Sequence, residues 1–372
     1  MKGKIKIERK ILLNPGPATT SDSVKMAQVV SDICPREKEF GEVMEFISQK
    51  LTDFVANNND FVSVLFGGSG TAGVESVLSS ICANSKILVI NNGSYSQRMV
   101  EILQTYNADF LEYKSDIIKP INFDDLEMTL KNHRFDYICA VHNETGTGLL
   151  NDIDKIGAIA KKYGAEFVVD AMSSYATIPI NMEKSHIDFL IASSNKNIQG
   201  MAGVVFVICK KDSLESLKDK KPKGFYLDLY AQYKHFAKTK QMRFTPPVQT
   251  LYALKQAIIE TIEEGIENRH KRYSESWETL INGLEKLHLK LLLDIKCQSK
   301  IITAIYEPKC EKYSFDSMHD FLYERNFTIY PGKVSAFDTF RVANIGAITK
   351  NDIANFLGIL EQYLKSIGYL AQ

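Results

Sequence analysis

Two residues carry the side chains of covalent and acid–base chemistry and follow apolar segments. Lys196 comes shortly after residues 189–192, in Ser193-Ser194-Asn195-Lys196, with Ser and Asn beside it rather than other charges. A lysine in that setting can form an imine with a carbonyl cofactor. Asp170 ends the preceding apolar segment, and a carboxylate beside a pyridine nitrogen keeps that nitrogen protonated, which makes the ring an electron sink. Asp170 could instead cap a helix, so its pairing with Lys196 is what indicates chemistry.

A glycine-rich segment could form an anion-binding site. Gly67-Gly68-Ser69-Gly70-Thr71 follows the apolar residues 61–66 and precedes a helical pattern. A turn of this kind presents backbone N–H groups at a helix N-terminus, where partial positive charge binds phosphate. The segment is not a Walker A motif, because no Lys-Ser/Thr follows, and it is not GxGxxG, so a nucleotide is not indicated. A plain tight turn remains the alternative.

Other polar residues stand at the ends of apolar segments or interrupt them. Thr145, after residues 137–141, could bond a phenolic oxygen, whereas the nearby His142 could equally be a satisfied core histidine. Tyr95, after residues 86–90, could stack on a flat ring or be ordinary half-buried core. Arg341 lies inside an apolar segment and cannot deprotonate, so it needs an anion. That anion could be a structural ion-pair partner or a substrate carboxylate or phosphonate.

The strands and helices predicted to position these residues indicate an α/β fold. Near-continuous apolar strands are expected at 61–66, 86–90, 137–141, 166–169, 189–192 and 203–208, separated by helix-length segments. Such strands predict a mostly parallel sheet covered on both faces. Ligands bind at the carboxyl ends of the strands in open α/β sheets, so the polar clusters should converge on one site.

The chain changes character after Pro246-Pro247. Helical spacing there predicts one helix of about 25 residues that bridges to a smaller unit. Residues 300–372 predict a small α+β unit with strands at 301–306 and 340–344 and helices at 315–324 and 350–366. The expected division is a large domain at 20–260 and a small domain made of 1–19 and 261–372.

Composition excludes several classes of protein. The 372 residues are 45% hydrophobic, and Lys+Arg and Asp+Glu both total 45. A net charge of zero argues against nucleic-acid or membrane-surface binding and fits an oligomer. The six cysteines show no CxxC or zinc spacing, so we expect buried free thiols, a reducing compartment and no metal. No stretch approaches ~18 apolar residues, and the basic residues 1–6 lack a following apolar region, so the predicted location is cytoplasmic.

Taken together and in order, these motifs resemble the class V aminotransferases of pyridoxal-phosphate (PLP) fold type I. The resemblance runs from about residue 10 to 365 and implies a seven-stranded type of sheet in the large domain. It also implies a homodimer with sites shared between subunits, taking a small-molecule amino donor and a 2-oxo acid. The motifs that carry it are Asn14-Pro15-Gly16-Pro17, Gly68-Ser69-Gly70-Thr71-Ala72, Asn92-Gly93-Ser94-Tyr95, His142-Asn143-Glu144-Thr145, Asp170-Ala171-Met172-Ser173-Ser174, Ser194-Asn195-Lys196-Asn197 and Phe340-Arg341-Val342-Ala343.

The resemblance implies roles for individual residues. Lys196 would be the Schiff-base lysine and proton shuttle, and Asp170 would pair with the pyridinium. Arg341 would clamp the anionic end of the substrate, with Asn14 and Gly16 also at the substrate. The residues implied to hold the cofactor are Ser69, Gly70, Thr71, Tyr95, Thr145, Asp170, Ser193, Lys196 and, from the neighbouring subunit, Thr245.

The implied reaction is transamination between 2-aminoethylphosphonate and pyruvate, giving phosphonoacetaldehyde and alanine, or the reverse. An alanine– or serine–glyoxylate aminotransferase of the same class would share every cofactor residue and stays open as the alternative.

This sequence differs from the family pattern at Asn14 and at residues 35–39. Arg36 in that segment could be a second cation for a phosphonate or a solvated surface charge. A desulfurase would need a mobile cysteine, for which Cys310 is the only weak candidate, and a non-catalytic member would be expected to lack Lys196 or Asp170.

Overall fold

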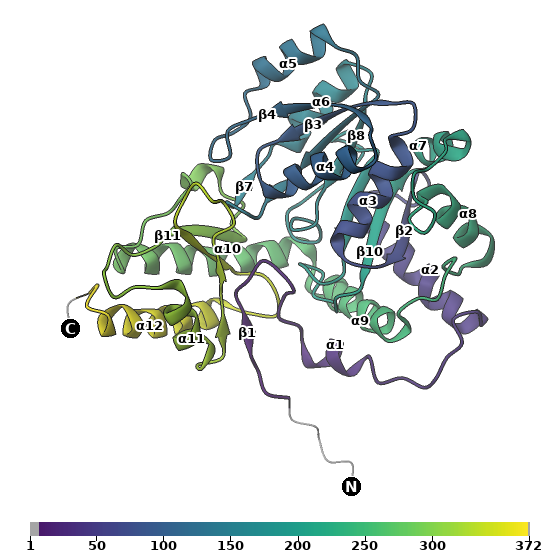
Figure 1. Ribbon diagram of the computed structural model, residues 1–372. Helices are drawn as coiled ribbons and strands as arrows, with labels where there is room; N and C mark the ends of the chain where they lie inside the picture. The colour runs from purple at the N-terminus through teal and green to yellow at the C-terminus, as the bar shows by residue number, and fades with distance from the viewer. Residues whose placement is uncertain (1–6, 371–372) are drawn as a thin grey trace.

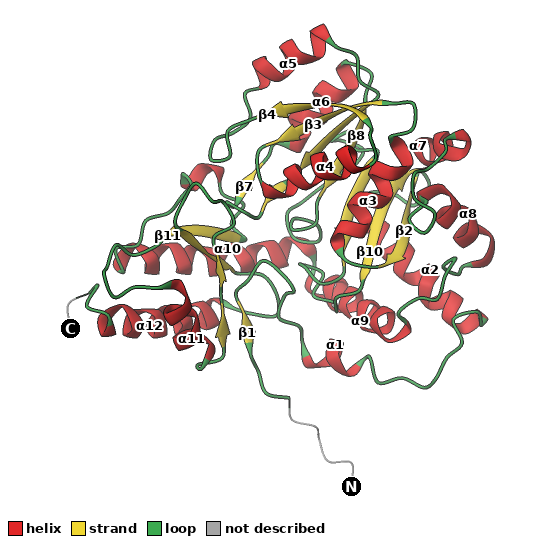
Figure 2. Ribbon diagram, viewed as in Figure 1, coloured by secondary structure: helices red, strands yellow, loops and turns green. Residues whose placement is uncertain are grey.

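A seven-stranded sheet forms the centre of the larger part of the molecule (Figure 1, Figure 2). The computed structural model describes residues 7–370, so the basic segment 1–6 lies outside the described residues. β10 is antiparallel to both of its neighbours, and every other pair in the sheet is parallel. The prediction of an α/β fold with a mostly parallel sheet is confirmed. The strand order is β2 (Phe61–Gly67), β10 (Val204–Lys210), β9 (Phe189–Ser193), β8 (Glu166–Asp170), β5 (Tyr137–Val141), β3 (Lys86–Asn91) and β4 (Asp109–Lys114).

One of these strands has no counterpart among the six that the sequence predicts. β4 pairs only with β3, at the edge of the sheet, and its residues are exposed or half-buried. An edge strand of this kind needs no continuous apolar sequence, and Asp109-Phe110-Leu111-Glu112-Tyr113-Lys114 has none. The apolar pattern therefore finds the buried strands and misses the exposed one.

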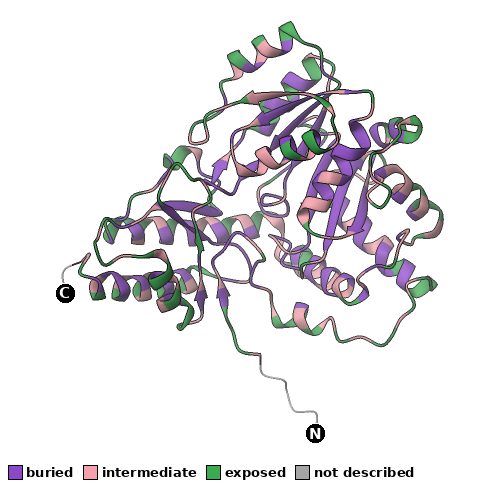
Figure 3. Ribbon diagram, in the orientation of Figure 1, coloured by how far each residue is buried: buried purple, intermediate pink, exposed green. Residues whose placement is uncertain are grey.

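Helices cover both faces of the sheet, as predicted. Successive strand residues point to opposite faces; Leu88 and Ile90 of β3 pack into one core, and Ile87 and Val89 pack into the other. Figure 3 shows the buried strands between partly exposed helices. The first core takes residues from α2 (Lys38–Asp53), α5 (Phe123–Asn132), α6 (Ile153–Lys162) and α9 (Val248–Glu264), and the second from α3 (Gly70–Ile81), α4 (Ser94–Thr105), α7 (Lys211–Glu215) and α8 (Leu229–Thr239).

A smaller antiparallel sheet lies beside the large one, on the left of Figure 2. Its strand order is β11 (Ile302–Tyr306), β14 (Thr339–Ala343) and β13 (Tyr330–Pro331). It packs in its own core with α10 (Ile266–Lys286), α11 (Phe315–Tyr323) and α12 (Lys350–Ser366). The predicted strands and helices of the C-terminal unit are therefore present; the domain boundaries themselves stay a prediction. The remaining elements are β1 (Ile11–Leu12), α1 (Asp22–Met26), β6 (Asn143–Glu144), β7 (Leu149–Leu150), β12 (Phe327–Thr328), η1 (Ser216–Asp219) and η2 (Ile295–Cys297).

The helix predicted after Pro246-Pro247 is wrong as a single element. The structure has two helices there, α9 and α10, and Gly265 separates them with φ +79°. Glycine reaches that left-handed backbone region without steric cost, so the break falls where the sequence allows it. The helical pattern alone did not reveal it, because apolar spacing continues through Ile262 and Ile266.

The cysteine prediction is only partly right. All six are free thiols, and Cys82, Cys139 and Cys209 are buried, but Cys34 is exposed and Cys297 and Cys310 are half-buried. Cys34 lies in the irregular segment between α1 and α2, where no sheet or helix covers it. Within residues 7–370, no helix combines the length and the apolar character that a membrane span requires.

The close approach of α3 to the sheet predicts the effect of one substitution. A Cβ at Gly73 would lie 2.4 Å from Val205 Cγ2 and 2.9 Å from Ile191 Cγ2. Gly73→Ala is therefore expected to lower the free energy of unfolding by about 1–3 kcal/mol, because buried side chains must shift. Urea unfolding followed by circular dichroism measures this change.

The matched control is Gly358→Ala in α12, where a Cβ would meet nothing within 4 Å. Alanine is the better helix former, so this variant should gain about 0.5–1 kcal/mol. Equal unfolding midpoints for the two variants would contradict the close helix–sheet contact at Gly73.

Candidate active site

The lysine and the aspartate both lie at the carboxyl ends of strands in the large sheet. β8 and β9 are parallel neighbours, with Asp170 opposite Ile191, and Lys196 follows the end of β9. Both residues line one cavity of 380 Å³. The convergence predicted from strand order is therefore what the structure has. The residues predicted for the site that line this cavity are Ser69, Gly70, Thr71, Tyr95, Asp170, Ser193 and Lys196.

The amine of Lys196 is held in a confined place. Its Nζ donates a hydrogen bond to the Pro15 carbonyl oxygen at 2.8 Å. A Cβ at Gly16, whose φ is +135°, would lie 2.1 Å from that Nζ, so only glycine leaves room for the amine. Burial lowers the pKa of the Lys196 ammonium. A lowered pKa raises the fraction of neutral amine, which is the nucleophilic form.

The carboxyl of Asp170 is buried as well. It is 4% exposed, and its Oδ1 accepts a hydrogen bond from the Met172 backbone N–H at 2.9 Å. Burial raises the pKa of Asp170 to about 6, against the lowering effect of that hydrogen bond. The residues after Asp170 form turns rather than a helix, so Asp170 does not cap a helix. A cation beside this carboxyl would favour its ionised form.

The glycine-rich turn forms the other end of the cavity. Ser69 is the N-cap of α3, but its side chain makes no capping hydrogen bond. Arg98, from α4, also lines the cavity, and its Nη1 donates to Thr71 Oγ1 at 3.3 Å. Arg98 was not among the residues predicted for the site from the sequence. Its signal was the spacing from Tyr95, because residues three apart on a helix share a face.

Tyr95 is fixed by a buried carboxyl that the sequence analysis also overlooked. The two Glu144 oxygens accept the backbone N–H groups of Tyr95 at 3.1 Å and Ser96 at 2.7 Å, and the Ser96 hydroxyl at 2.6 Å. Burial raises the pKa of Glu144, although these hydrogen bonds oppose the rise. The helix N-terminus of α4 is thereby capped from a separate loop, which sets the position of Tyr95. An acidic residue inside the predicted cluster 142–145 was the available signal.

Positive charge gathers around the Tyr95 hydroxyl. Burial alone would raise its pKa, but the Thr145 side chain and the charges of Lys333, Lys196 and Arg341 outweigh burial and lower it. Arg341 is 5% exposed; its Nε donates to the Pro331 carbonyl oxygen at 3.0 Å and its Nη1 to that of Thr145 at 3.0 Å. Among residues 7–370 no carboxylate lies within ion-pair distance of Arg341. The structural ion pair that the sequence left open is not found there.

Several predicted residues lie elsewhere. Thr245 is exposed and lines a separate hollow with residues 32–35 rather than the Lys196 cavity of its own chain. Arg36 donates to the carbonyl oxygens of Met242 at 2.7 Å and Arg243 at 3.2 Å. These hydrogen bonds connect the segment that contains Arg36 to the residues that precede Thr245. Asn14 Nδ2 donates to the Pro17 carbonyl oxygen at 3.0 Å, which holds the turn that contains Gly16.

His142 belongs to the core. It is buried, its Nδ1 lies 2.9 Å from Ser174 Oγ, and burial lowers its pKa to about 4. It is therefore neutral near neutral pH and lies outside the cavity lining. The structure thus agrees with the interpretation of His142 as a satisfied core histidine.

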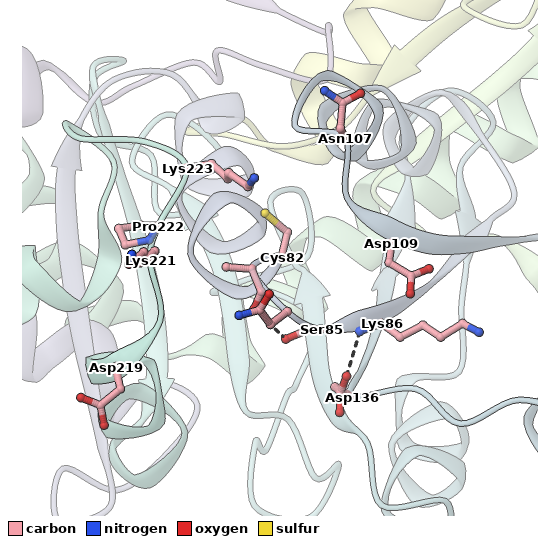
Figure 4. A pocket seen from close by; sticks show the side chains of 12 residues that line it. Cys82, Ser85, Lys86, Asn107, Asp109, Asp136, Asp219, Lys221, Pro222 and Lys223 are labelled. Carbon is pink, nitrogen blue, oxygen red and sulfur yellow. Dashed lines mark hydrogen bonds between the residues drawn. The ribbon is translucent and has the colours of Figure 1, made fainter.

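A larger hollow of 840 Å³ lies at the opposite edge of the sheet, where β3, β4 and β5 begin (Figure 4). Asp136 there accepts the backbone N–H of Lys86 at 2.8 Å, a contact that fixes the start of β3. Asp109, Asp219, Lys221 and Lys223 also line it. Size does not make this hollow the site, because ligands of open α/β sheets bind at the carboxyl ends of the strands.

Comparison with known proteins decides the family. A family model described as "Aminotransferase class-V" matches residues 22–350. The chain belongs to the class V aminotransferases. It is 39% identical over 352 residues to a 2-aminoethylphosphonate–pyruvate transaminase of Salmonella paratyphi B, covering 93% of this chain and 95% of that protein. It is also 37% identical to a bifunctional phosphonoacetaldehyde hydrolase/aminoethylphosphonate transaminase of Clostridioides difficile, covering 95% of this chain and 56% of that longer protein.

Solved structures support the same fold for this aminotransferase. A ureidoglycine–glyoxylate aminotransferase from Bacillus subtilis superposes with a TM-score of 0.89 at 20% identity, covering 99% of this chain and 96% of that one. An alanine–glyoxylate aminotransferase from Nostoc gives 0.89 at 23% identity, covering 98% and 97%. At these identities the likeness concerns the fold alone. The predicted fold type I architecture is confirmed.

The raised pKa of Asp170 predicts how its replacement affects stability. In the cofactor-free protein the carboxyl ionises near pH 6 when folded, against an ordinary value of 3.8. The folded state therefore loses stability as pH rises from about 4 to about 6, by on the order of 3 kcal/mol. Asp170→Asn cannot ionise, so the cofactor-free variant should be more stable than wild type at pH 7.5 by about 1–3 kcal/mol.

Urea unfolding of both cofactor-free proteins between pH 4 and pH 8 measures the effect. The advantage of the variant should vanish near pH 4, where the wild-type carboxyl is protonated in the folded state. A difference in stability that does not change with pH would show that Asp170 is not buried as an ionisable group.

Proposed function

We propose that this aminotransferase exchanges an amino group between 2-aminoethylphosphonate and pyruvate, giving phosphonoacetaldehyde and alanine or running in reverse, with PLP in the Lys196 cavity. The observation that carries the proposal is the 39% identity, along 93% of the chain, to a relative named for that reaction. The buried Arg341 supports it, because both substrates bear an anionic group.

The residues of the cavity fit three of the groups of PLP: its aldehyde, its ring nitrogen and its phosphate. Lys196 supplies the amine for its aldehyde, and Asp170 supplies the carboxyl for its ring nitrogen. The N-terminus of α3 and Arg98 supply N–H donors and positive charge for its phosphate. When bound, PLP supplies an aldehyde that exchanges amine partners and a ring that withdraws electrons from the substrate.

The side chains of this chain then have separate tasks. The neutral Nζ of Lys196 accepts the proton that leaves the substrate Cα and returns it in the reverse direction. The ionised Asp170 keeps a proton on the ring nitrogen through a charge-assisted hydrogen bond. Tyr95, set by Glu144, supplies a flat face at the cavity wall. Arg341 orients the anionic end of the substrate toward the lysine.

A second copy of the chain would complete the site. Phe225 and Tyr226 are 78% and 42% exposed, and Tyr226 stacks on Phe244 with ring centroids 5.2 Å apart. The Tyr226 hydroxyl donates to the Gly67 carbonyl oxygen at 3.3 Å, so this aromatic cluster borders the glycine-rich turn. Exposed aromatic clusters mark protein interfaces. We therefore propose a homodimer in which Thr245, next to Phe244, reaches the phosphate site of the neighbouring subunit.

The substrate assay is the first test. Purified protein with PLP, 2-aminoethylphosphonate and pyruvate should form alanine, and omission of either substrate should abolish it. Lys196→Ala should lose this turnover by a factor of about 10² to 10⁴, because the proton acceptor is removed. Lys221→Ala, at the opposite edge of the sheet, is the matched lysine control and should retain activity.

The same assay decides against the proposal if the amino acceptor is different. Activity with alanine or serine and glyoxylate, without activity on 2-aminoethylphosphonate, would make the enzyme a glyoxylate aminotransferase. Borohydride reduction of the loaded protein should attach the cofactor to Lys196 in a peptide map, whichever substrates are used. Attachment at any other lysine would contradict the PLP site itself.

Arg98 should act on cofactor affinity. Arg98→Met removes the cation that contacts Thr71 and should raise the dissociation constant of PLP by about 10- to 100-fold, as expected for a hydrogen bond to a charged group. Equilibrium dialysis measures this constant without turnover. Arg134→Met, at an exposed position outside the cavity, should leave it unchanged. Equal affinity in wild type and Arg98→Met would exclude Arg98 from the phosphate end.

A further inference from the structure

Arg341 faces two different anions in the proposed reaction. A phosphonate carries up to two negative charges on three oxygens, whereas the carboxylate of pyruvate or alanine carries one charge on two oxygens. The guanidinium has five N–H donors, of which Nε and one on Nη1 are directed to the carbonyl oxygens of Pro331 and Thr145. The donors that remain can hold a carboxylate in a two-point contact. They leave the second charge of a phosphonate without a partner of its own.

A second cation is built on the same hairpin as Arg341. β13 and β14 pair antiparallel, with Tyr330 opposite Arg341, and residues 332–338 connect them. The loop is closed by backbone hydrogen bonds from Gly332 N–H to the Thr339 carbonyl oxygen at 2.6 Å and from Phe337 N–H to that of Val334 at 3.1 Å. Lys333 stands at the start of this loop, two residues after the Pro331 carbonyl that holds Arg341.

The hairpin loop brings Lys333 to the wall of the Lys196 cavity. Its Nζ lies 4.1 Å from the centroid of the Tyr95 ring, and Tyr95 lines that cavity. Val334 lies over the loop at Gly146, where a Cβ would be 3.7 Å from Val334 Cγ2. Lys333 and Arg341 thus both lie close to one tyrosine, and both charges act on its hydroxyl and on the Lys196 amine.

Lys333 is also exposed and, among the described residues, forms no salt bridge. Within residues 7–370 no carboxylate lies within 4 Å of its Nζ, whereas many other lysines of the chain have such a partner. Its charge acts on the buried Glu144 carboxyl, but the ammonium lies over the aromatic wall of the cavity without an ion-pair partner, so its hydrogen-bond donors are available to a ligand. Arg36, the cation considered from the sequence, binds backbone carbonyls away from the cavity of its own chain.

We propose that Lys333 is a specificity-determining residue that contacts the second charge of a phosphonate substrate while Arg341 holds the first. The proposal rests on the proposed function and names how that site prefers a dianionic phosphonate to a monoanionic carboxylate. Arg341 serves both substrates of the reaction, and Lys333 serves one. Removing Lys333 should therefore weaken the phosphonate substrate selectively.

The test compares Lys333→Met with wild type on both substrates. The KM for 2-aminoethylphosphonate should rise about tenfold or more, because one charged contact is lost. The KM for pyruvate and the kcat should stay close to their wild-type values. Lys333→Arg should restore most of the affinity for 2-aminoethylphosphonate, because the charge is kept. Lys309→Met, an exposed lysine elsewhere in the C-terminal unit, is the matched control and should behave as wild type.

A pair of inhibitors gives a readout that does not need turnover of the phosphonate. Ethylphosphonate and propanoate share a chain length and differ in the anionic group, and wild type should bind ethylphosphonate more tightly. Lys333→Met should lose most of that preference. If wild type fails to use 2-aminoethylphosphonate, the proposed function falls and this inference falls with it. If wild type uses it and Lys333→Met changes both KM values equally, or neither, only the role of Lys333 is overturned.

Discussion

The burial of one amine and one carboxyl at the same edge of the large sheet is the constraint on which the site depends. Parallel pairing of β8 and β9 brings Asp170 and Lys196 to that edge, and exclusion of water shifts both of their pKa values toward the neutral forms. An unpaired charge there would be costly. A cationic ligand beside the carboxyl would favour its ionised form, and a carbonyl compound would meet the amine in its nucleophilic neutral form.

The start of the chain contributes to this constraint from the other unit. β1 pairs with β12 of the C-terminal unit, and Ala18 N–H donates to the Asn195 carbonyl oxygen at 2.9 Å. Between these anchors, the Pro15 carbonyl accepts from Lys196 and Gly16 leaves space for its amine. The lysine is therefore held by a segment that both units position. Arg341 and Lys333 approach from the same C-terminal unit, so one body carries both of the cations proposed to contact the substrate's anion.

The extent to which the sequence predicts this arrangement follows from how local each signal is. Buried parallel strands need apolar residues on both faces, so the apolar pattern alone places Asp170 and Lys196 at the strand ends. The edge strand β4 was not predicted, because its faces are partly exposed. The helix break at Gly265 was not predicted either, because a single glycine also occurs inside helices. Glu144 lay inside a cluster that the sequence singled out, but its contact with Tyr95, like that of Lys333, joins segments far apart in the chain, which no local pattern records. The cavity of 380 Å³ is likewise a property of packing, which no local pattern records.

The Glu144 carboxyl makes the two helix starts near the cavity unequal as sites for an anion. Two helices, α3 and α4, start near the cavity, and each helix start would attract a phosphate. At α4 the backbone N–H groups of Tyr95 and Ser96 already donate to Glu144, so they are not available to bind a phosphate. At α3 the Ser69 side chain leaves the helix start uncapped. A ligand that carries a phosphate would therefore be expected to place it at the start of α3 rather than at the start of α4.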